Sequence, residues 1–198
     1  MMQKLIIASG NPGKLREMKA ILGDYYDEIL SMQEAGVAVD VVEDGETFLE
    51  NARKKAVEIS LLVDADVVSD DSGLSVVGLG GRPGVYSARY SAAGTDEANN
   101  EKLICEVTPL SEEKRAASYI CAIVLARKGE VIFEGEGTCD GKIILEPRGA
   151  GRFGYDPYFY LEEYGITFAE MDPNKKNKIS HRARALQKLE AFVEQERK

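Results

Sequence analysis

The chain has 198 residues, of which 44% are hydrophobic, enough for one domain with a hydrophobic core. It contains no apolar run of membrane-spanning length, and its first residues lack the apolar stretch and cleavage site of a signal peptide. We therefore expect a cytoplasmic protein without a membrane partner. The formal net charge of -9 argues against a general nucleic-acid-binding protein, which would usually be basic.

The three cysteines predict neither a disulfide framework nor a zinc site. Cys105, Cys121 and Cys139 are odd in number and show no C-x-x-C spacing. We expect them to be buried, behaving as small hydrophobic residues in a reducing compartment.

The first elements alternate between strand and helix. An apolar run at residues 5–8 predicts a strand, and Asn11 and Pro12 suit the N-cap and first position of the helix that follows. A second helix is expected from near Glu46, capped by Asp44 or Thr47.

The central part of the chain changes to β structure. A short buried strand is expected at 65–68 and a third helix at 95–107. The β-branched run at 117–125, a turn at Gly129 and the run at 131–137 then predict a hairpin. A final helix should begin after Ser180, so the fold class is α/β with an antiparallel insertion.

An acidic motif follows the predicted strand at 65–68. Ser69-Asp70-Asp71-Ser72-Gly73 places two adjacent carboxylates where that strand is expected to end, at the usual ligand crevice of an α/β sheet. Paired carboxylates are costly unless a cation or proton shares their site, and oxygen ligands near phosphate favour Mg²⁺. The alternative is a solvated acidic turn.

A glycine-rich loop before the first helix is a candidate phosphate site. Backbone N–H groups and the positive helix end meet there, and Lys14 adds a cation. The Walker A spacing is absent, and an ordinary helix start is the alternative. The residues concerned are Ser9, Gly10, Asn11, Pro12, Gly13 and Lys14.

Two C-terminal motifs offer an aromatic ring and cations. Phe153-Gly154-Tyr155-Asp156-Pro157 supplies a ring that can stack on a base, although a turn with a buried ring is the alternative. Residues 174–188 contain no acid and hold Lys176 and Ser180-His181-Arg182. This basic window suits a small polyanion, but a solvated helix start is equally compatible with charge alone.

These four segments, in this order and spacing, resemble the inosine triphosphate pyrophosphatase family over nearly the whole chain. The resemblance implies a single domain over residues 1–198, with an elongated mixed sheet, flanking helices and two lobes around a central nucleotide cleft. It also implies a homodimer, for which residues 82–90 are a candidate surface.

The resemblance assigns roles to matching residues. It implies that the loop from Ser9 to Lys14 binds the triphosphate and that Asp71 is the general base and a Mg²⁺ ligand. Ser72 can contact substrate through its hydroxyl or its backbone. The family pattern places a second metal-associated Glu three residues before a Gly. This chain has Val42 there, so Glu43, one place later, is the candidate.

The resemblance places the aromatic motif against the base: Phe153, Gly154, Tyr155 and Asp156. Lys176 is expected to contact phosphate, as Lys14 is, and His181 and Arg182 complete the expected substrate contacts. Donors such as Arg or imidazolium match a 6-keto purine and disfavour the amino group of adenine.

The implied activity is Mg²⁺-dependent hydrolysis of inosine, deoxyinosine and xanthosine triphosphates to monophosphate and pyrophosphate, which removes deaminated purines from the nucleotide pool. A non-catalytic nucleotide sensor and a phosphatase of another phosphorylated metabolite are the alternatives.

Overall fold

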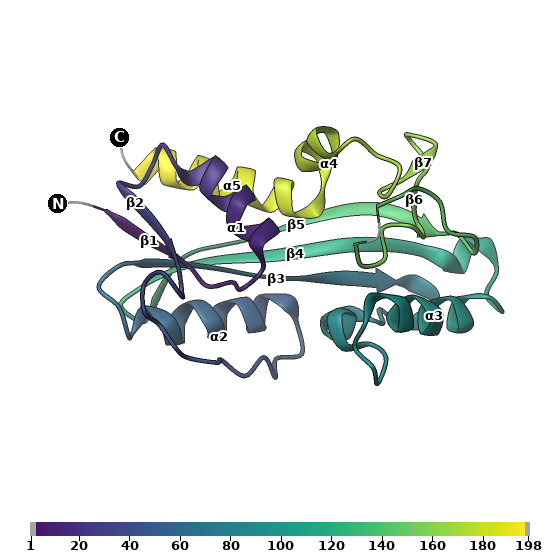
Figure 1. The fold of residues 1–198 in the computed structure, drawn as a ribbon, viewed down its shortest axis with the longest axis horizontal. Coiled ribbons are helices and arrows are strands. Elements are labelled where there is room, and N and C mark those ends of the chain that lie inside the picture. The colour runs from purple at the N-terminus through teal and green to yellow at the C-terminus, as the bar shows by residue number, and fades with distance from the viewer. Residues whose placement is uncertain (1–2, 152, 197–198) are drawn as a thin grey trace. The chain divides into compact units, whose positions relative to one another are not determined.

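The computed structural model describes residues 3–151 and 153–196, and the chain divides into two compact units (Figure 1). Unit 1 comprises Met1–Asp71, Cys121–Gly137 and Arg182–Lys198. Unit 2 comprises Ser72–Ile120 and Thr138–His181. The mixed α/β class and the two-part organisation expected from the sequence are confirmed.

Unit 1 is built on strands whose order is β2-β1-β3-β4-β5. β1 pairs in parallel with both β2 and β3. Helices α1 and α5 cover one face of these strands and α2 covers the other (Figure 1). The bounds are β1 (Lys4–Ile7), α1 (Pro12–Leu22), β2 (Glu28–Ser31), α2 (Phe48–Ser60), β3 (Asp66–Val76), β4 (Ala116–Arg127), β5 (Glu130–Ile143) and α5 (His181–Glu196).

The alternation of side chains along β1 explains how both faces of the unit 1 strands become covered. Leu5 and Ile7 belong to the cluster that includes residues of α1 and α5, whereas Ile6 packs with Ile59 of α2. Successive strand residues point to opposite faces, so one short apolar run serves two cores. Each fully buried side chain of this size contributes about 1.5–3 kcal/mol.

The caps expected from the sequence are present. Asn11 accepts hydrogen bonds at the start of α1, with Pro12 as the first helical residue. Thr47, rather than Asp44, caps α2, and its side chain and that of Glu50 form a reciprocal capping box.

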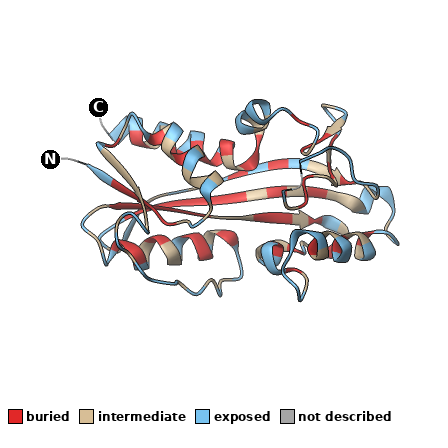
Figure 2. Ribbon diagram, viewed as in Figure 1, coloured by how far each residue is buried: buried red, intermediate tan, exposed pale blue. Residues whose placement is uncertain are grey.

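The predicted hairpin is β4 and β5, joined by Lys128 and Gly129. Both linking residues have positive φ, 51° and 85°, which is the geometry of a two-residue hairpin turn. Apolar residues of β4 are buried in unit 1, as Figure 2 shows for the strands generally.

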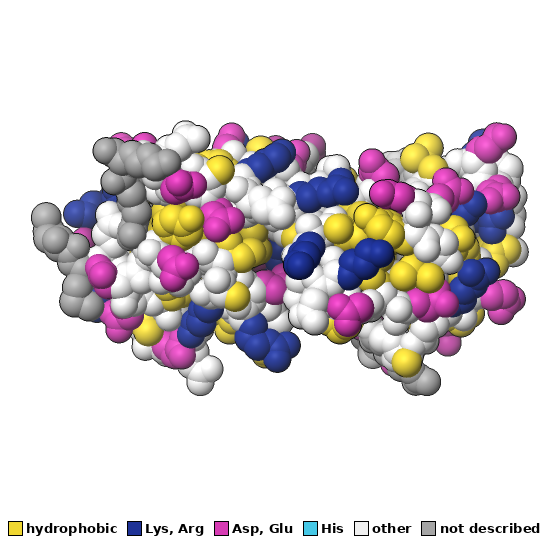
Figure 3. Space-filling model, turned by 90° about the horizontal axis from the view of Figure 1, so that it is seen from above, with side chains coloured by type: hydrophobic (Ala, Val, Ile, Leu, Met, Phe, Trp, Pro, Cys, Tyr) yellow, Lys and Arg dark blue, Asp and Glu magenta, His cyan; other side chains and the backbone are white. Residues whose placement is uncertain are grey.

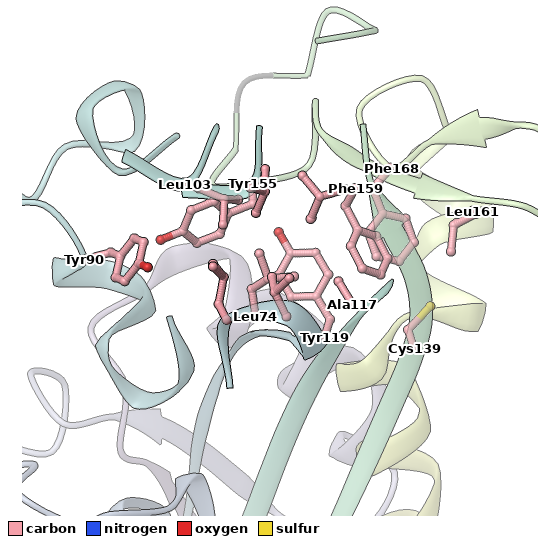
Figure 4. Packing of buried hydrophobic residues seen from close by; sticks show 14 of the residues in the cluster. Leu74, Tyr90, Leu103, Ala117, Tyr119, Cys139, Tyr155, Phe159, Leu161 and Phe168 are labelled. Carbon is pink, nitrogen blue, oxygen red and sulfur yellow. The ribbon is translucent and has the colours of Figure 1, made fainter. Parts of the chain in front are cut away.

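Unit 2 contains the remaining strands, two further α-helices and three short 3-10 helices. The strands and α-helices are α3 (Asp96–Val107), β6 (Phe159–Leu161), β7 (Ile166–Thr167) and α4 (Pro173–Ile179), and the 3-10 helices span Val77–Leu79, Gly84–Arg89 and Glu112–Arg115. Its strand order is β3-β4-β5-β6-β7, with β6 antiparallel to both neighbours. The rings of Tyr119, Phe159 and Phe168 pack together at the centre of its core, with centroids 4.7–5.8 Å apart (Figure 4).

Two expectations about local structure were wrong. β3 does not end before the acidic motif but continues through Asp70 and Asp71 to Val76, because apolar Leu74 and Val76 extend its buried pattern. Cys105 is exposed, whereas Cys121 and Cys139 are buried as expected. Within the described parts of the chain, no helix is both long and apolar enough to span a membrane.

Candidate active site

The loop between β1 and α1 presents backbone at the start of a helix. Asn11 Oδ1 accepts hydrogen bonds from Gly13 N at 2.9 Å and Lys14 N at 3.3 Å, so the cap already satisfies two of the helix's first N–H groups. A Cβ added to Gly10 would have no protein atom within 4 Å beyond its chain neighbours. Gly10 therefore leaves space beside the loop backbone for a ligand group.

Asp70 is a fully buried carboxylate that holds two cations. Lys14 Nζ lies 2.8 Å from Asp70 Oδ2, and Arg182 Nε lies 3.6 Å from the same oxygen. Burial alone would raise the pKa of Asp70, but the charges of Lys14 and Arg182 outweigh it and lower the pKa. Asp70 is thus an ionised partner for two cations and a poor proton acceptor.

Arg182 is held between two acids. Its Nη1 lies 3.1 Å from Glu17 Oε2, in addition to its approach to Asp70. Burial alone would lower the pKa of Arg182, but these two carboxylates raise it. The nearby Cys121 thiol has its pKa raised by burial and by Asp70, so it stays a neutral thiol.

The pKa of Asp71 is shifted in the opposite direction from that of its neighbour Asp70. It is partly exposed, and its Oδ2 accepts a hydrogen bond from Asn51 Nδ2 at 3.0 Å. Burial, followed by the charge of Glu43, raises the pKa of Asp71, although the Asn51 hydrogen bond opposes this. Adjacent strand residues face opposite sides, which explains why one carboxylate meets α1 and α5 and the other meets α2.

Helix α2 supplies two supporting residues that the sequence reasoning missed. Asn51 Oδ1 accepts a hydrogen bond from Gly45 N at 2.8 Å while its amide donates to Asp71. Lys55 Nζ lies 2.5 Å from Glu43 Oε1. Asn51 and Lys55 are four residues apart on one helical face, a spacing that was readable beside the apolar positions of this helix.

The carboxylates of Asp71 and Glu43 fit a hard divalent cation. Their oxygens are the donor type that Mg²⁺ prefers, and after burial the negative charge of Glu43 is a further cause of the raised pKa of Asp71. Among residues 3–151 and 153–196, no group of three or more His, Cys, Asp or Glu forms a ready-made metal cluster. The two carboxylates are therefore candidate ligands whose remaining partners come from elsewhere.

A second group of predicted residues lies in unit 2. The side chains of Tyr155 and Asp156 are buried, whereas Phe153 is 60% exposed. Lys176 Nζ donates to Asp156 Oδ2, and the Tyr119 hydroxyl lies 3.4 Å from Asp156 Oδ1. Lys176 therefore neutralises a buried carboxylate, a contact that the sequence did not predict.

The single histidine, His181, packs among these same residues of unit 2. The His181 ring stacks on Tyr119, with centroids 4.8 Å apart and planes inclined by 10°. Lys176 Nζ also lies 5.6 Å from the centre of the Phe153 ring. Tyr119 was missed by the sequence reasoning, although a tyrosine within an apolar strand run indicates a hydroxyl that needs a polar partner.

Neighbouring residues of the motifs contribute to different groups. His181 contacts the aromatic core of unit 2, whereas Arg182 contacts Asp70 and Glu17 in unit 1. Ser72 follows Asp71 in β3 and is partly exposed. The predicted residues thus form a charged group with Glu43, Asp71, Lys14 and Arg182, and an aromatic group with Phe153, Tyr155, Asp156, Lys176 and His181.

Comparisons with known proteins agree with the resemblance over nearly the whole chain. The chain is 49% identical over 196 residues to the dITP/XTP pyrophosphatase of Clostridium perfringens, covering 95% of this chain and 96% of that protein. It is 45% identical over 194 residues to the dITP/XTP pyrophosphatase of Bacillus subtilis, covering 98% of each.

Solved structures of two related proteins have the same fold over nearly the whole chain. The Ham1 protein of Staphylococcus aureus has a TM-score of 0.90 at 37% identity, covering 98% of this chain and all of that one (100%). A HAM1 protein from Coxiella burnetii gives a TM-score of 0.91 at 36% identity, with coverage of 98% and 100%. The model of the Ham1 family matches residues 5–192, and this chain belongs to that family.

Proposed function

We propose that the chain hydrolyses inosine, deoxyinosine and xanthosine triphosphates to the monophosphate and pyrophosphate. The relatives named dITP/XTP pyrophosphatases support this substrate class. The observation that carries the mechanism is the contrast between adjacent carboxylates: the pKa of Asp70 is lowered by two cations, and that of Asp71 is raised. A lowered pKa suits a charge anchor, and a raised pKa suits a general base.

Asp71 is the proposed proton acceptor. A water molecule forms a new bond to phosphorus, the α–β phosphoanhydride bond breaks, pyrophosphate leaves, and the water proton passes to the Asp71 carboxylate. The hydrogen bond from Asn51 fixes one carboxylate oxygen and so orients the other. Positioning of this kind accounts for much of the catalysis of phosphoryl transfer.

Asp71 and Glu43 are the proposed Mg²⁺ ligands. The ion, when bound, neutralises charge on the phosphate oxygens and on both carboxylates. Lys55 Nζ lies 2.5 Å from Glu43 Oε1 and so restrains this side chain. The pKa of Asp71 is raised by burial and then by the charge of Glu43, which supports Glu43 as the second ligand despite its displacement by one place from the family position.

Lys14 and Arg182, with the loop from Ser9, are the proposed phosphate contacts. Their shared partner Asp70 restricts the positions of both cations before substrate binds. Ser72, next to Asp71 in β3, is the proposed additional hydroxyl contact. Preorganised charge of this kind is worth more in a partly buried site than in water.

The aromatic group of unit 2 is proposed to recognise the base. The exposed Phe153 ring offers a stacking surface, and the His181 and Lys176 side chains offer donors to a 6-keto oxygen. Adenine presents an amino donor at that position, which leaves donors unpaired. Guanine has to be rejected through its additional 2-amino group.

A panel assay tests the proposal. Pyrophosphate and orthophosphate release are measured with Mg²⁺ from inosine, xanthosine, guanosine and adenosine triphosphates. We expect pyrophosphate from the first two at much higher kcat/KM. Binding without turnover supports a sensor instead, and orthophosphate release supports a phosphatase.

We also propose a cytoplasmic homodimer without a nucleic-acid partner. On the face shown in Figure 3, acidic and basic side chains are interspersed, unlike the uniformly basic surfaces that bind nucleic acid. Tyr86, within the candidate surface at 82–90, is 58% exposed. Analytical ultracentrifugation of the wild type and of Tyr86→Lys tests the dimer, which we expect the substitution to weaken.

A further inference from the structure

The peptide at Gly154 is held at both of its polar groups by one helix. Gly154 N donates to Asp96 Oδ2 at 2.8 Å, and Asn100 Nδ2 donates to Gly154 O at 2.8 Å. Asp96 and Asn100 are four residues apart in α3 and therefore lie on the same face of that helix. Two side chains from one rigid element thus grip a single residue of a loop.

Gly154, which these two hydrogen bonds hold, lies between the buried ring of Tyr155 and the exposed ring of Phe153. Tyr155 is 4% exposed, and its hydroxyl donates to Ser87 O at 2.6 Å. Phe153, on the other side of Gly154, is 60% exposed. Phe153 O accepts from Asp156 N at 3.2 Å, which closes a tight turn around Gly154. The direction of the Phe153 ring therefore depends on how the Gly154 peptide is oriented.

Gly154 needs hydrogen bonds from outside its turn to hold it in one backbone conformation. Its φ is +52°, a conformation that glycine reaches without a Cβ penalty. Glycine also occupies many other conformations at little cost, so the sequence alone leaves this turn flexible. The two hydrogen bonds from α3 select one of these conformations.

Capping does not explain the presence of Asp96. The N-cap of α3 is Thr95, whose side chain accepts a hydrogen bond from Ala98 N at 3.3 Å. Glu97 already supplies a second negative charge to the first turn of the helix. The contact with Gly154 distinguishes Asp96 from Glu97.

We propose that Asp96 and Asn100 are positioning residues that orient Phe153 for stacking on the purine base. They act through Gly154, without touching the substrate, and set the affinity for the base rather than the rate of phosphate chemistry. This inference rests on the proposed function, because it needs Phe153 to contact the base.

The kinetic test compares four variants with the parent enzyme on inosine triphosphate. Asp96→Ala and Asn100→Ala should each raise KM by about threefold to tenfold, the scale of one lost hydrogen bond. Asp96→Asn keeps an acceptor oxygen and should restore most of the affinity. Glu97→Ala is the matched control in the same helical turn and should change nothing.

Inhibition by pyrophosphate distinguishes an effect on the orientation of Phe153 from a general loss of stability. Pyrophosphate carries no base, so its inhibition constant should stay within about twofold of the parent value in every variant. A lower kcat with unchanged KM, or equal weakening for pyrophosphate, contradicts the proposal.

A binding reporter keeps the test independent of turnover. The chain has no tryptophan, so Phe153→Trp introduces a single indole at the proposed stacking position. Inosine monophosphate should quench its fluorescence, and Asn100→Ala in that background should raise the dissociation constant by about threefold to tenfold. An unchanged dissociation constant overturns the inference. If the parent chain releases no pyrophosphate, the proposed activity fails, while this titration still decides the role of Asn100.

Discussion

The two units handle their polar groups in contrasting ways. In unit 1, the charge of the buried Asp70 is balanced by Lys14 and Arg182 on one side of β3. On the other side of the strand, the pKa of Asp71 is raised. In unit 2, the buried Asp156 is balanced by Lys176 among aromatic rings. Concentrated charge suits phosphate chemistry, and rings with few donors suit recognition of a base. Rate and selectivity should therefore respond to substitutions in different units.

Asp71→Asn should produce the largest loss of activity. Removing the proposed base and metal ligand should lower kcat by more than about 10²-fold. Because burial and Glu43 raise the pKa of Asp71, its ionised form is unfavourable in the folded state, so the neutral amide should raise Tm at neutral pH. Steady-state kinetics and thermal unfolding measure both effects. Full activity in this variant removes Asp71 from the mechanism.

Asp70→Asn should have the opposite effect on stability. It leaves Lys14 and Arg182 partly uncompensated, and breaking a buried ion pair costs about 3 kcal/mol. A folded pKa below the unfolded value means that the stabilisation is present above the unfolded pKa of about 3.9 and is lost as pH falls through the folded pKa. Denaturant unfolding at several pH values should show the two proteins converging in acid. A constant difference in stability between them would refute this charge account.

Lys14→Ala and Lys176→Ala compare the contributions of unit 1 and unit 2 to phosphate binding. Both lysines were expected to contact phosphate, but Lys176 pairs with Asp156 and lies near the rings of Phe153 and Phe168. Lys14→Ala should weaken pyrophosphate inhibition by about 1–3 kcal/mol, and the affinity of the parent for pyrophosphate should fall with added salt. Lys176→Ala should leave pyrophosphate inhibition largely unchanged. Equal weakening by the two substitutions would return Lys176 to the phosphate contacts.

Much of the local structure was predictable because its causes are local. The helix that follows Asn11 and Pro12 begins where their backbone preferences dictate, and the turn at Gly129 supports the hairpin. The motifs and the family resemblance also supplied the candidate site residues, whose roles stay predictions. The partners of those residues were not predictable, because the contact of Asp70 with Arg182 joins positions far apart in the chain. Adjacent residues of any strand lie on opposite faces, but which of Asp70 and Asp71 faces α1 and α5 likewise depends on tertiary packing.

His181→Ala should change selectivity more than rate. Its ring belongs to the unit 2 aromatic group, whereas the adjacent Arg182 belongs to the charged group of unit 1. Losing a donor to the 6-keto oxygen should reduce the kcat/KM ratio of inosine over adenosine triphosphate by about tenfold. Arg182→Lys keeps a positive charge but loses the planar guanidinium, and it should lower kcat/KM for both nucleotides alike. A uniform decrease in the His181 variant would place this residue with the phosphate contacts.

Tyr119→Phe should give the smallest change in stability and activity. It tests whether the preference for inosine triphosphate depends on the stacked ring of Tyr119 or on its hydroxyl. The phenyl ring keeps the parallel contact with His181, while the 3.4 Å contact between the hydroxyl and Asp156 is lost. Lys176 still neutralises Asp156, so the free energy of unfolding should fall by only about 0.5–1 kcal/mol. Tyr119→Leu removes the ring as well and should reduce both stability and the preference for inosine triphosphate. If Tyr119→Phe alone abolishes that preference, then the hydroxyl and the carboxylate of Asp156, rather than the stacked rings, set the specificity of unit 2.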